Sequence, residues 1–397
     1  MSKKVLILNT TFNQGGAANL AHDLFIKFRN DQDLSLYFAY GRGKKSLEPN
    51  TYYFGNKLES FFHLILVRFL GLEGFGTYFA TKKLINFIAK EKFDLIHIHN
   101  LHGYYLNFFQ LLNYLQQQNI KVAWTLHDEW LFTWLPAHSL GCTHCHTLLG
   151  KCSNQYGYPK NYFPVFSHFM LKKKRSILSL SNISFISPAE WLYEKARNEF
   201  NLSNIALIPN GVDLNVFKPA DNKSDLRKKY GLPLNKKIVL FSANNLRDKN
   251  KGGSYFLKLV ETFRHNPDYI FCLVGSSRLP RVKNLISLGY ISDAKKMAEI
   301  YALADLYCFF SAAETSPLSV LEATACGLPI LAFKIKALEY LLFGEGNLLV
   351  EYGNTGLMLE SFKKFFSSDY SPTKKNSALS RPDEMFSSYR EVYLASF

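Results

Sequence analysis

Residues 305–333 read DLYCFFSAAETSPLSVLEATACGLPILAF, and the expected fold follows from this segment. Residues 306–310 form a short apolar run rich in aromatic side chains, as in a buried strand, and residues 330–333 form a second such run. Between the runs we predict a helix that Ser316 caps and that Gly327 ends in a left-handed turn. The order strand, loop, helix, strand is the repeating unit of an open α/β sheet.

The start of this predicted helix has the properties of an anion-binding site. We expect Pro317 at the first helical position, where its missing N–H costs nothing. The amides of Leu318 and Ser319 then lack acceptors within the helix, and they lie at its positive end, where α/β sheets bind ligands. Glu314 and Glu322 would flank the anion in places that suit hydroxyl groups. A nucleotide sugar, with a diphosphate between two sugars, fits this arrangement.

The composition indicates a two-domain protein with anionic partners. The chain has 397 residues, of which 47% are hydrophobic, enough for two cores. Its formal charge of +15 favours a nucleotide, a lipid phosphate, a membrane surface or nucleic acid as partner. Six cysteines do not form a disulfide scaffold in a chain of this length. The start MSKKVLILNT lacks a signal peptide, and no apolar run approaches the roughly 20 residues of a membrane span. We therefore expect an intracellular protein, at most peripheral to a membrane.

The two glutamates also occur in a setting that resembles a known family. Seven residues separate Glu314 from Glu322, and Gly327 and Pro329 follow them. This pattern resembles the signature of the family 4 retaining glycosyltransferases. The segments DLIHIHNLHGYYLN and TLHDEW resemble a polysaccharide-biosynthesis branch of that family. The resemblance covers nearly the whole chain and implies an α/β fold with two Rossmann-like domains facing each other across a cleft, the architecture called GT-B.

The resemblance also implies roles for individual residues. Lys251, followed by glycine, and Arg247 would stabilise the departing diphosphate, where negative charge grows as the glycosidic bond breaks. Glu322 would hold the ribose hydroxyls. Glu314 and His127, the predicted catalytic residues, would hold and place the donor sugar, and no cofactor is needed for catalysis. The predicted donor-binding residues are Gly16, Arg247, Lys251, Gly275, Ser316, Leu318, Ser319 and Glu322.

Two glycine turns belong to this donor-binding set. Gly15 and Gly16 follow a predicted strand at residues 4–9 and let the backbone approach a ligand at the start of a helix, although a plain turn explains them equally well. They do not form GxGxxG, which argues against a nicotinamide site. Gly275 follows a predicted strand at residues 269–274, where it would turn the chain on the nucleobase side.

The predicted domains are residues 1–213, on the acceptor side, and residues 214–380, which bind the nucleotide sugar. The segment PNGVD before residue 214 looks like the family's interdomain junction. A last helix over residues 383–396 would pack back onto the first domain, as in relatives. After residue 333 the sequence departs from the family, because IKALEYLL replaces the usual Gly-Gly before a Pro-Glu.

The segment HSLGCTHCHTLLGKC allows two interpretations. Three thiolates and one histidine could form the tetrahedral ligand set of a structural zinc ion. Free or redox-active cysteines are the alternative. The ligands of the zinc interpretation are Cys142, Cys145, Cys152 and His138. A catalytic zinc is not expected, because this fold class generally needs no metal.

Residues 41–83 are basic and aromatic, with an apolar run over residues 61–70. Together with the basic run at residues 172–175, they could form a surface that inserts apolar side chains into a membrane and attracts anionic lipid. The alternative is an ordinary buried helix beside a solvated charge run.

These observations predict a retaining glycosyltransferase that moves a hexose or N-acetylhexosamine from a nucleoside diphosphate sugar to a surface polysaccharide or a lipid-linked glycan precursor. We expect it in the cytoplasm, at the inner face of the membrane if it is peripheral. The alternatives are a non-catalytic GT-B partner, suggested by the missing Gly-Gly, and a sugar-nucleotide epimerase of similar fold. A nucleic-acid binder built on the cysteine segment ranks behind both, and nucleic acid is not among the expected partners.

Overall fold

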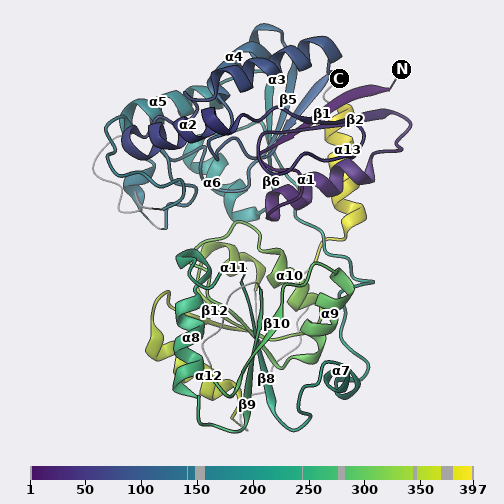
Figure 1. The fold of residues 1–397 in the computed structure, drawn as a ribbon, viewed down its shortest axis with the longest axis vertical. Helices are drawn as coiled ribbons and strands as arrows, with labels where there is room; N and C mark the ends of the chain where they lie inside the picture. The colour runs from purple at the N-terminus through teal and green to yellow at the C-terminus, as the bar shows by residue number, and fades with distance from the viewer. Residues whose placement is uncertain are drawn as a thin grey trace. The chain divides into compact units, whose positions relative to one another are not determined.

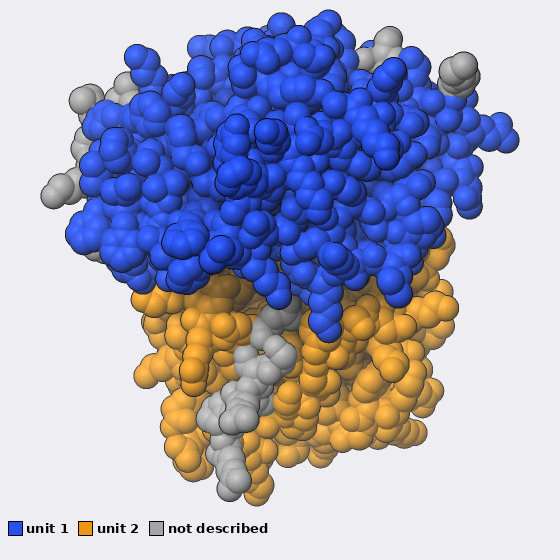
Figure 2. All heavy atoms as spheres, turned by 45° about the horizontal axis from the view of Figure 1, so that its top comes forward, with its two compact units in different colours: residues 1–209, 383–397 blue, residues 210–382 orange. Residues whose placement is uncertain are grey.

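The computed structural model describes residues 2–140, 142–147, 157–243, 245–275, 282–342, 347–367 and 379–395. The chain forms two compact units, which Figure 2 distinguishes by colour. Unit 1 consists of residues 1–209 and 383–397, and unit 2 consists of residues 210–382. The domain boundaries predicted from the sequence fall after residues 213 and 380, whereas the compact units divide after residues 209 and 382.

Unit 1 is built on a parallel sheet of seven strands in the order β3-β2-β1-β4-β5-β6-β7. The strands are β1 (Lys3–Asn9), β2 (Leu34–Tyr40), β3 (Thr51–Tyr53), β4 (Leu95–Ile98), β5 (Lys121–Thr125), β6 (Ile183–Ser187) and β7 (Ile205–Leu207). The strand order reverses beside β1, so the loops after β1 and β4 meet at the carboxyl edge of the sheet, where such sheets bind ligands.

Helices complete unit 1 (Figure 1). They are α1 (Gly16–Lys27), α2 (Lys57–Leu70), α3 (Tyr78–Glu91), α4 (Phe108–Gln117), α5 (Ser167–Leu178) and α6 (Glu190–Phe200), with a 3₁₀ turn, η1 (Thr143–Cys145). The last helix, α13 (Pro382–Ala395), packs beside α1 through Tyr389 and Tyr393. Arg390 donates to Asp31 at 2.8 Å, and the Tyr393 hydroxyl shares a hydrogen bond of 2.7 Å with buried His97.

Unit 2 repeats the architecture with a six-stranded parallel sheet in the order β10-β9-β8-β11-β12-β13. Its strands are β8 (Lys237–Ser242), β9 (Tyr269–Val274), β10 (Leu285–Gly289), β11 (Leu306–Phe309), β12 (Ile330–Phe333) and β13 (Leu348–Val350). Its helices are α7 (Lys223–Lys229), η2 (Lys249–Lys251), α8 (Gly253–Thr262), α9 (Ala294–Leu303), α10 (Leu318–Ala325), α11 (Lys336–Leu341) and α12 (Thr355–Phe365). The predicted strand, helix, strand order of residues 305–333 is therefore confirmed, with Gly327 at φ +69° after α10.

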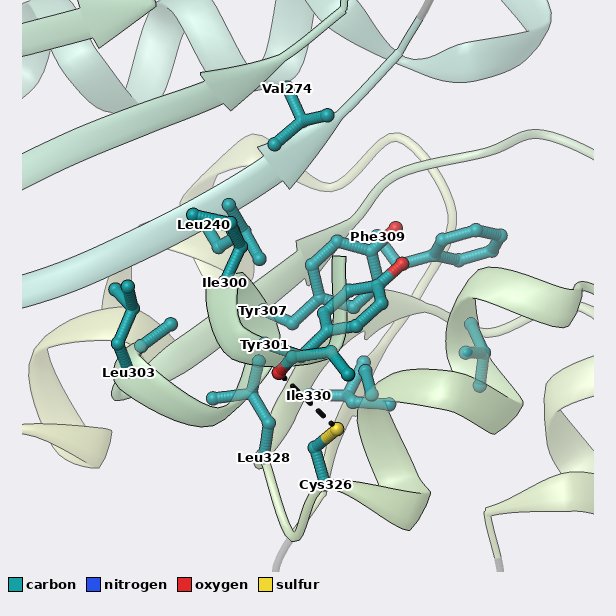
Figure 3. Close-up of a cluster of buried hydrophobic side chains, with 14 of the residues drawn as sticks. Leu240, Val274, Ile300, Tyr301, Leu303, Tyr307, Phe309, Cys326, Leu328 and Ile330 are labelled. Carbon is teal, nitrogen blue, oxygen red and sulfur yellow. Dashed lines mark hydrogen bonds between the residues drawn. The ribbon is translucent and has the colours of Figure 1, made fainter. Parts of the chain in front are cut away.

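Both faces of the unit 2 sheet are buried. Ile238 and Leu240 pack in a cluster with α9 and α10, of which Figure 3 shows a part. Val239 and Phe241 pack in a second cluster with α8 and α12. Because helices cover both faces, successive positions of a strand are apolar rather than alternating.

Helix α2 is not the ordinary buried helix that the sequence offers as an alternative. Only His63 and Val67 are buried along its length. Large apolar side chains, among them Phe62 and Phe69, are about half exposed. No described helix is long and apolar enough to cross a membrane.

Candidate active site

The start of α10 lies at the carboxyl end of β11, as predicted, but its cap differs from the prediction. Pro317 is the N-cap residue, with extended backbone at ψ 104°, and none of the described side chains caps the helix. Its carbonyl accepts from the amide of Val320 at 3.0 Å, so Pro317 is not the first helical residue and Ser316 is not the cap. The amides of Leu318 and Ser319 still lie in the first turn of α10, where a helix offers them no acceptor.

Lys251 and Glu314 form an ion pair in unit 2. The Lys251 ammonium donates to Glu314 Oε1 at 2.6 Å, across 63 residues of sequence. Both side chains reach solvent, at 44% and 20% exposure. The structure therefore brings the predicted diphosphate cation and the predicted sugar-binding carboxylate together, which their positions in the sequence do not reveal.

Close backbone packing places the two loops that carry this pair. Gly252 has φ +69°, and a Cβ atom there would lie 2.0 Å from the carbonyl oxygen of Phe310, at the end of β11. The amide of Ala312 donates to the carbonyl of Asn250 at 2.8 Å. Glycine is required at this contact, because a side chain would force the β8–α8 connection away from the loop that holds Glu314.

Glu322 lies on α10 and is partly buried. Burial raises the pKa of its carboxyl group to about 7, and a hydrogen bond of 3.2 Å from the Tyr301 hydroxyl partly opposes that shift. The carboxyl group therefore changes its charge near neutral pH, and perturbed pKa values of this kind are common at functional sites. Sequence reasoning missed Tyr301, which has the pattern of a plain core residue of α9.

Tyr307 of β11 links the predicted residues of this site. Its hydroxyl lies 2.6 Å from Ser242 Oγ at the end of β8, and it also hydrogen-bonds with the Ser319 side chain. Burial raises the pKa of this hydroxyl to about 12, and the charges of Glu322 and Glu314 add to the shift. The charges of Glu314 and Glu322 thus both affect one buried hydroxyl, which also contacts Ser319 in the first turn of α10.

The remaining donor-side predictions lie on two loops of unit 2 and at the start of one helix of unit 1. Arg247 is exposed on the β8–α8 connection, and its amide donates to Asn245 Oδ1 at 2.9 Å. Gly275 follows β9, and its amide donates to the carbonyl of Gly289 at 2.9 Å. Gly16 starts α1 in unit 1, where an added Cβ would meet nothing within 4 Å. Arg247 and Gly275 therefore share the carboxyl edge of the unit 2 sheet, whereas Gly16 belongs to the equivalent edge of unit 1.

Histidines at the ends of β4 and β5 form two pairs in unit 1. His127 Nε2 lies 2.8 Å from Nδ1 of His99, and burial lowers the pKa of His127 to about 4. His102 Nε2 lies 2.8 Å from Asp128 Oδ2. Burial opposes the charge of Asp128, but the His102 charge and hydrogen bond outweigh it and lower the pKa of Asp128 to about 2. His127 is therefore a neutral imidazole at neutral pH, beside a charged pair.

A buried network that the sequence did not indicate lies next to these histidines. Glu73 is fully buried and accepts from Trp130 Nε1 at 2.7 Å and from the amide of Gly103 at 3.1 Å. Lys174 is also fully buried, and it donates to the carbonyl of Trp130 at 2.8 Å. Burial lowers the pKa of Lys174 to about 7. Lys174 is therefore a core residue, and assigning it to a membrane-facing basic run was wrong.

The predicted zinc ligands are only partly described. Cys145 is disulfide-bonded, so its sulfur is not a thiolate in this structure, whereas Cys142 takes no part in a disulfide. His138 is partly buried, and Cys152 lies outside the described residues. Across the described ranges, no group of three histidine, cysteine or acidic side chains could hold a metal ion. The zinc site stays a prediction.

Comparison with known protein families gives two matches that together span most of the chain. Residues 14–216 match Glycosyltransferase Family 4. Residues 236–367 match the family described as Glycosyl transferases group 1. The first match covers much of unit 1, and the second covers the residues of unit 2 that form the candidate site.

Two relatives from Escherichia coli are similar in sequence. WcaC of strain K12, assigned as a colanic acid biosynthesis glycosyl transferase, is 25% identical over 83% of this chain and 82% of its own. UDP-Gal:alpha-D-GlcNAc-diphosphoundecaprenol alpha-1,3-galactosyltransferase is 31% identical over 36% of this chain and 39% of its own.

Solved structures share the fold. Sucrose-phosphate synthase from Thermosynechococcus elongatus has a TM-score of 0.69 at 18% identity, over 99% of this chain and 100% of that one. Anabaena HepE, solved in complex with UDP and glucose, has a TM-score of 0.68 at 15% identity, over the full length of both chains. The fold is therefore GT-B, as predicted.

Proposed function

Because this chain belongs to glycosyltransferase family 4 and is a glycosyltransferase of the polysaccharide-biosynthesis type, we propose that it moves a hexose or N-acetylhexosamine from a nucleoside diphosphate sugar to a glycan hydroxyl with retention. The observation that carries the proposal is the Lys251–Glu314 ion pair beside the open start of α10. It combines a cation for a diphosphate with a carboxylate for sugar hydroxyls.

In this proposal donor binding rearranges the ion pair. The Lys251 ammonium turns from Glu314 to the diphosphate, and the first-turn amides of α10 take up part of the remaining charge. Arg247, exposed on the same connection, supplies a second cation. Glu314, released from Lys251, accepts hydrogen bonds from hydroxyls of the donor sugar. Cations held at the leaving group favour the transition state, because negative charge increases there as the sugar departs.

The acceptor hydroxyl attacks the anomeric carbon from the face that the diphosphate leaves. The proton of the attacking hydroxyl passes to the leaving diphosphate, so no enzymatic nucleophile and no cofactor is assigned a role. His127 orients the sugar as a neutral hydrogen-bonding group, since burial lowers its pKa to about 4. We further propose a lipid-linked glycan as acceptor, at the cytoplasmic face of a membrane. One relative's name specifies an acceptor of that kind, a diphosphoundecaprenol glycan.

A donor panel tests the proposal. Purified protein is melted with nucleoside diphosphate sugars that differ in base and sugar, and a matching donor is expected to stabilise the fold by about 2.7 kcal/mol when present at 100 times its Kd. Lys251→Ala should lose this shift, whereas Lys249→Ala, which alters an exposed lysine of η2, should keep it. Stabilisation followed by sugar transfer supports the proposal. Epimerisation without an acceptor, or binding without any turnover, would assign one of the alternative functions.

Vesicle binding tests the membrane part of the proposal. Half-exposed Phe62 and Phe69 of α2, with neighbouring lysines and arginines, should hold the protein on anionic vesicles. Binding should weaken as salt is raised, because each surface cation contributes about 1 kcal/mol through a screened attraction. Co-sedimentation at low and high salt is the measurement. Absence from anionic vesicles at both salt concentrations would remove the membrane surface from the list of partners.

A further inference from the structure

Helix α2 has three faces, each built from residues spaced three or four apart. The buried face consists of His63 and Val67. The second face is exposed and apolar, and it consists of Leu58, Phe62, Ile65 and Phe69. The third face lines two hollows in unit 1, and it consists of Lys57, Phe61, Leu64 and Arg68. We call it the basic face because it carries the two cations of this set. An apolar surface and a basic surface therefore lie side by side on one helix.

The two hollows are adjacent and strongly basic. Their volumes are about 410 Å³ and 390 Å³, and both are lined by Arg42, Leu64 and Tyr104. The cations along their walls are Arg42, Lys57, Arg68 and Lys160. Among the described residues, none of the ion pairs involves any of these four side chains.

The polar groups of these walls have unused hydrogen-bonding capacity. Arg68 Nε is buried and has no hydrogen-bond partner among the described residues, which is a costly state for a charged group. The Arg42 guanidinium donates from Nη1 to the carbonyl of Gly103 at 3.1 Å. The carboxylate of Glu73, near this carbonyl, already accepts hydrogen bonds from the amide of Gly103 and from Trp130 Nε1. The described residues that line the hollows include four cations and no carboxylate, so the hollows favour a ligand with more than one negative charge.

We propose that these hollows bind the diphosphate of a lipid-linked acceptor. The inference rests on the proposed function and adds a site for the anionic end of its acceptor. A polyprenyl diphosphate carries its charge directly beside its apolar chain, and α2 presents the basic face directly beside the apolar face. Arg42 and Arg68 bind the diphosphate oxygens as planar donors, with Lys57 and Lys160 as further cations. The exposed apolar face of α2 contacts the start of the lipid chain.

The test measures binding of a soluble short-chain prenyl diphosphate to the full chain. All variants carry Lys251→Ala, so that diphosphate binding in unit 2 does not contribute. Arg68→Gln should weaken binding about tenfold or more, since a charge-assisted hydrogen bond is lost. Lys90→Gln removes the same charge from an exposed position of α3 and should leave the affinity unchanged. The affinity of Arg68→Lys, which keeps the charge, should lie between those of the other two variants. Thermal unfolding checks that each variant is folded.

Three results would overturn the assignment. Equal losses of affinity in Arg68→Gln and Lys90→Gln would mean that binding depends only on the net charge of the protein. Unchanged affinity in a folded Arg68→Gln variant would remove the site. Equally tight binding of inorganic diphosphate, with the same dependence on Arg68, would exclude the lipid as the recognised ligand. Donor binding is measured in parallel with Lys251 intact, so failure of the donor site is seen separately from failure of this one.

Discussion

Replacing Lys251 with alanine is expected to lower kcat for sugar transfer about 100- to 1,000-fold, the usual cost of removing one group that stabilises developing charge. The ammonium lies 2.6 Å from Glu314 beside the start of α10, where the diphosphate is proposed to bind. Its contribution increases as the glycosidic bond breaks, so kcat should fall in addition to the loss of donor affinity. Single-turnover transfer rates at saturating donor measure it directly.

The design must separate lost charge stabilisation from an orphaned carboxylate. Lys251→Ala leaves Glu314 without its ammonium partner, so the double variant Lys251→Ala/Glu314→Gln is measured beside both single variants. We expect Glu314→Gln and Glu314→Ala to lose turnover as well, because the proposed contacts to the donor sugar need the carboxylate. Lys249→Ala serves as control for a lost lysine on the same turn. A full rate in Glu314→Ala, or a rise in KM alone in Lys251→Ala, would contradict the roles assigned here.

Donor affinity is expected to depend on pH through Glu322. Burial raises the pKa of this carboxyl group to about 7, and hydroxyl groups of a ligand donate to its ionised form. Below pH 7, binding must therefore displace a proton, and affinity should rise about tenfold per pH unit before it levels off above pH 7. Donor Kd values measured from acid to mildly alkaline pH give this profile.

Glu322→Gln should flatten the affinity profile and weaken the donor about tenfold or more at alkaline pH, where a charged acceptor is replaced by a neutral one. The same substitution should raise the stability of the fold at alkaline pH, although it weakens donor binding there. Because folding raises the pKa of this carboxyl group from its ordinary value of 4.5 to about 7, the protonated group favours the folded state below pH 4.5, and this contribution is lost as pH rises through about 7. Glu322→Gln should therefore melt at a higher temperature than wild type at alkaline pH. A pH-dependent affinity that persists in this variant would assign the titration to another group.

Local sequence patterns determined much of the fold. The apolar runs at residues 306–310 and 330–333 predict β11 and β12, because a strand covered on both faces is apolar at every position. Gly327 predicts the end of α10, since a left-handed backbone favours glycine. The start of α10 was predicted one residue early, because the extended backbone of Pro317 and its carbonyl, not the Ser316 side chain, make the cap.

Long-range packing decided what the sequence could not. The Lys251–Glu314 pair depends on the contact of Gly252 with Phe310, which joins two loops that are far apart in the chain. The shifted pKa of Glu322 depends on burial, and burial is a property of every element packed around a residue. Lys174 reads as part of a basic surface run, yet tertiary packing buries it against Trp130. Motifs thus specified the strands, the turn and the chemical types of the site residues, whereas partners, charge states and exposure were fixed only when distant segments came together.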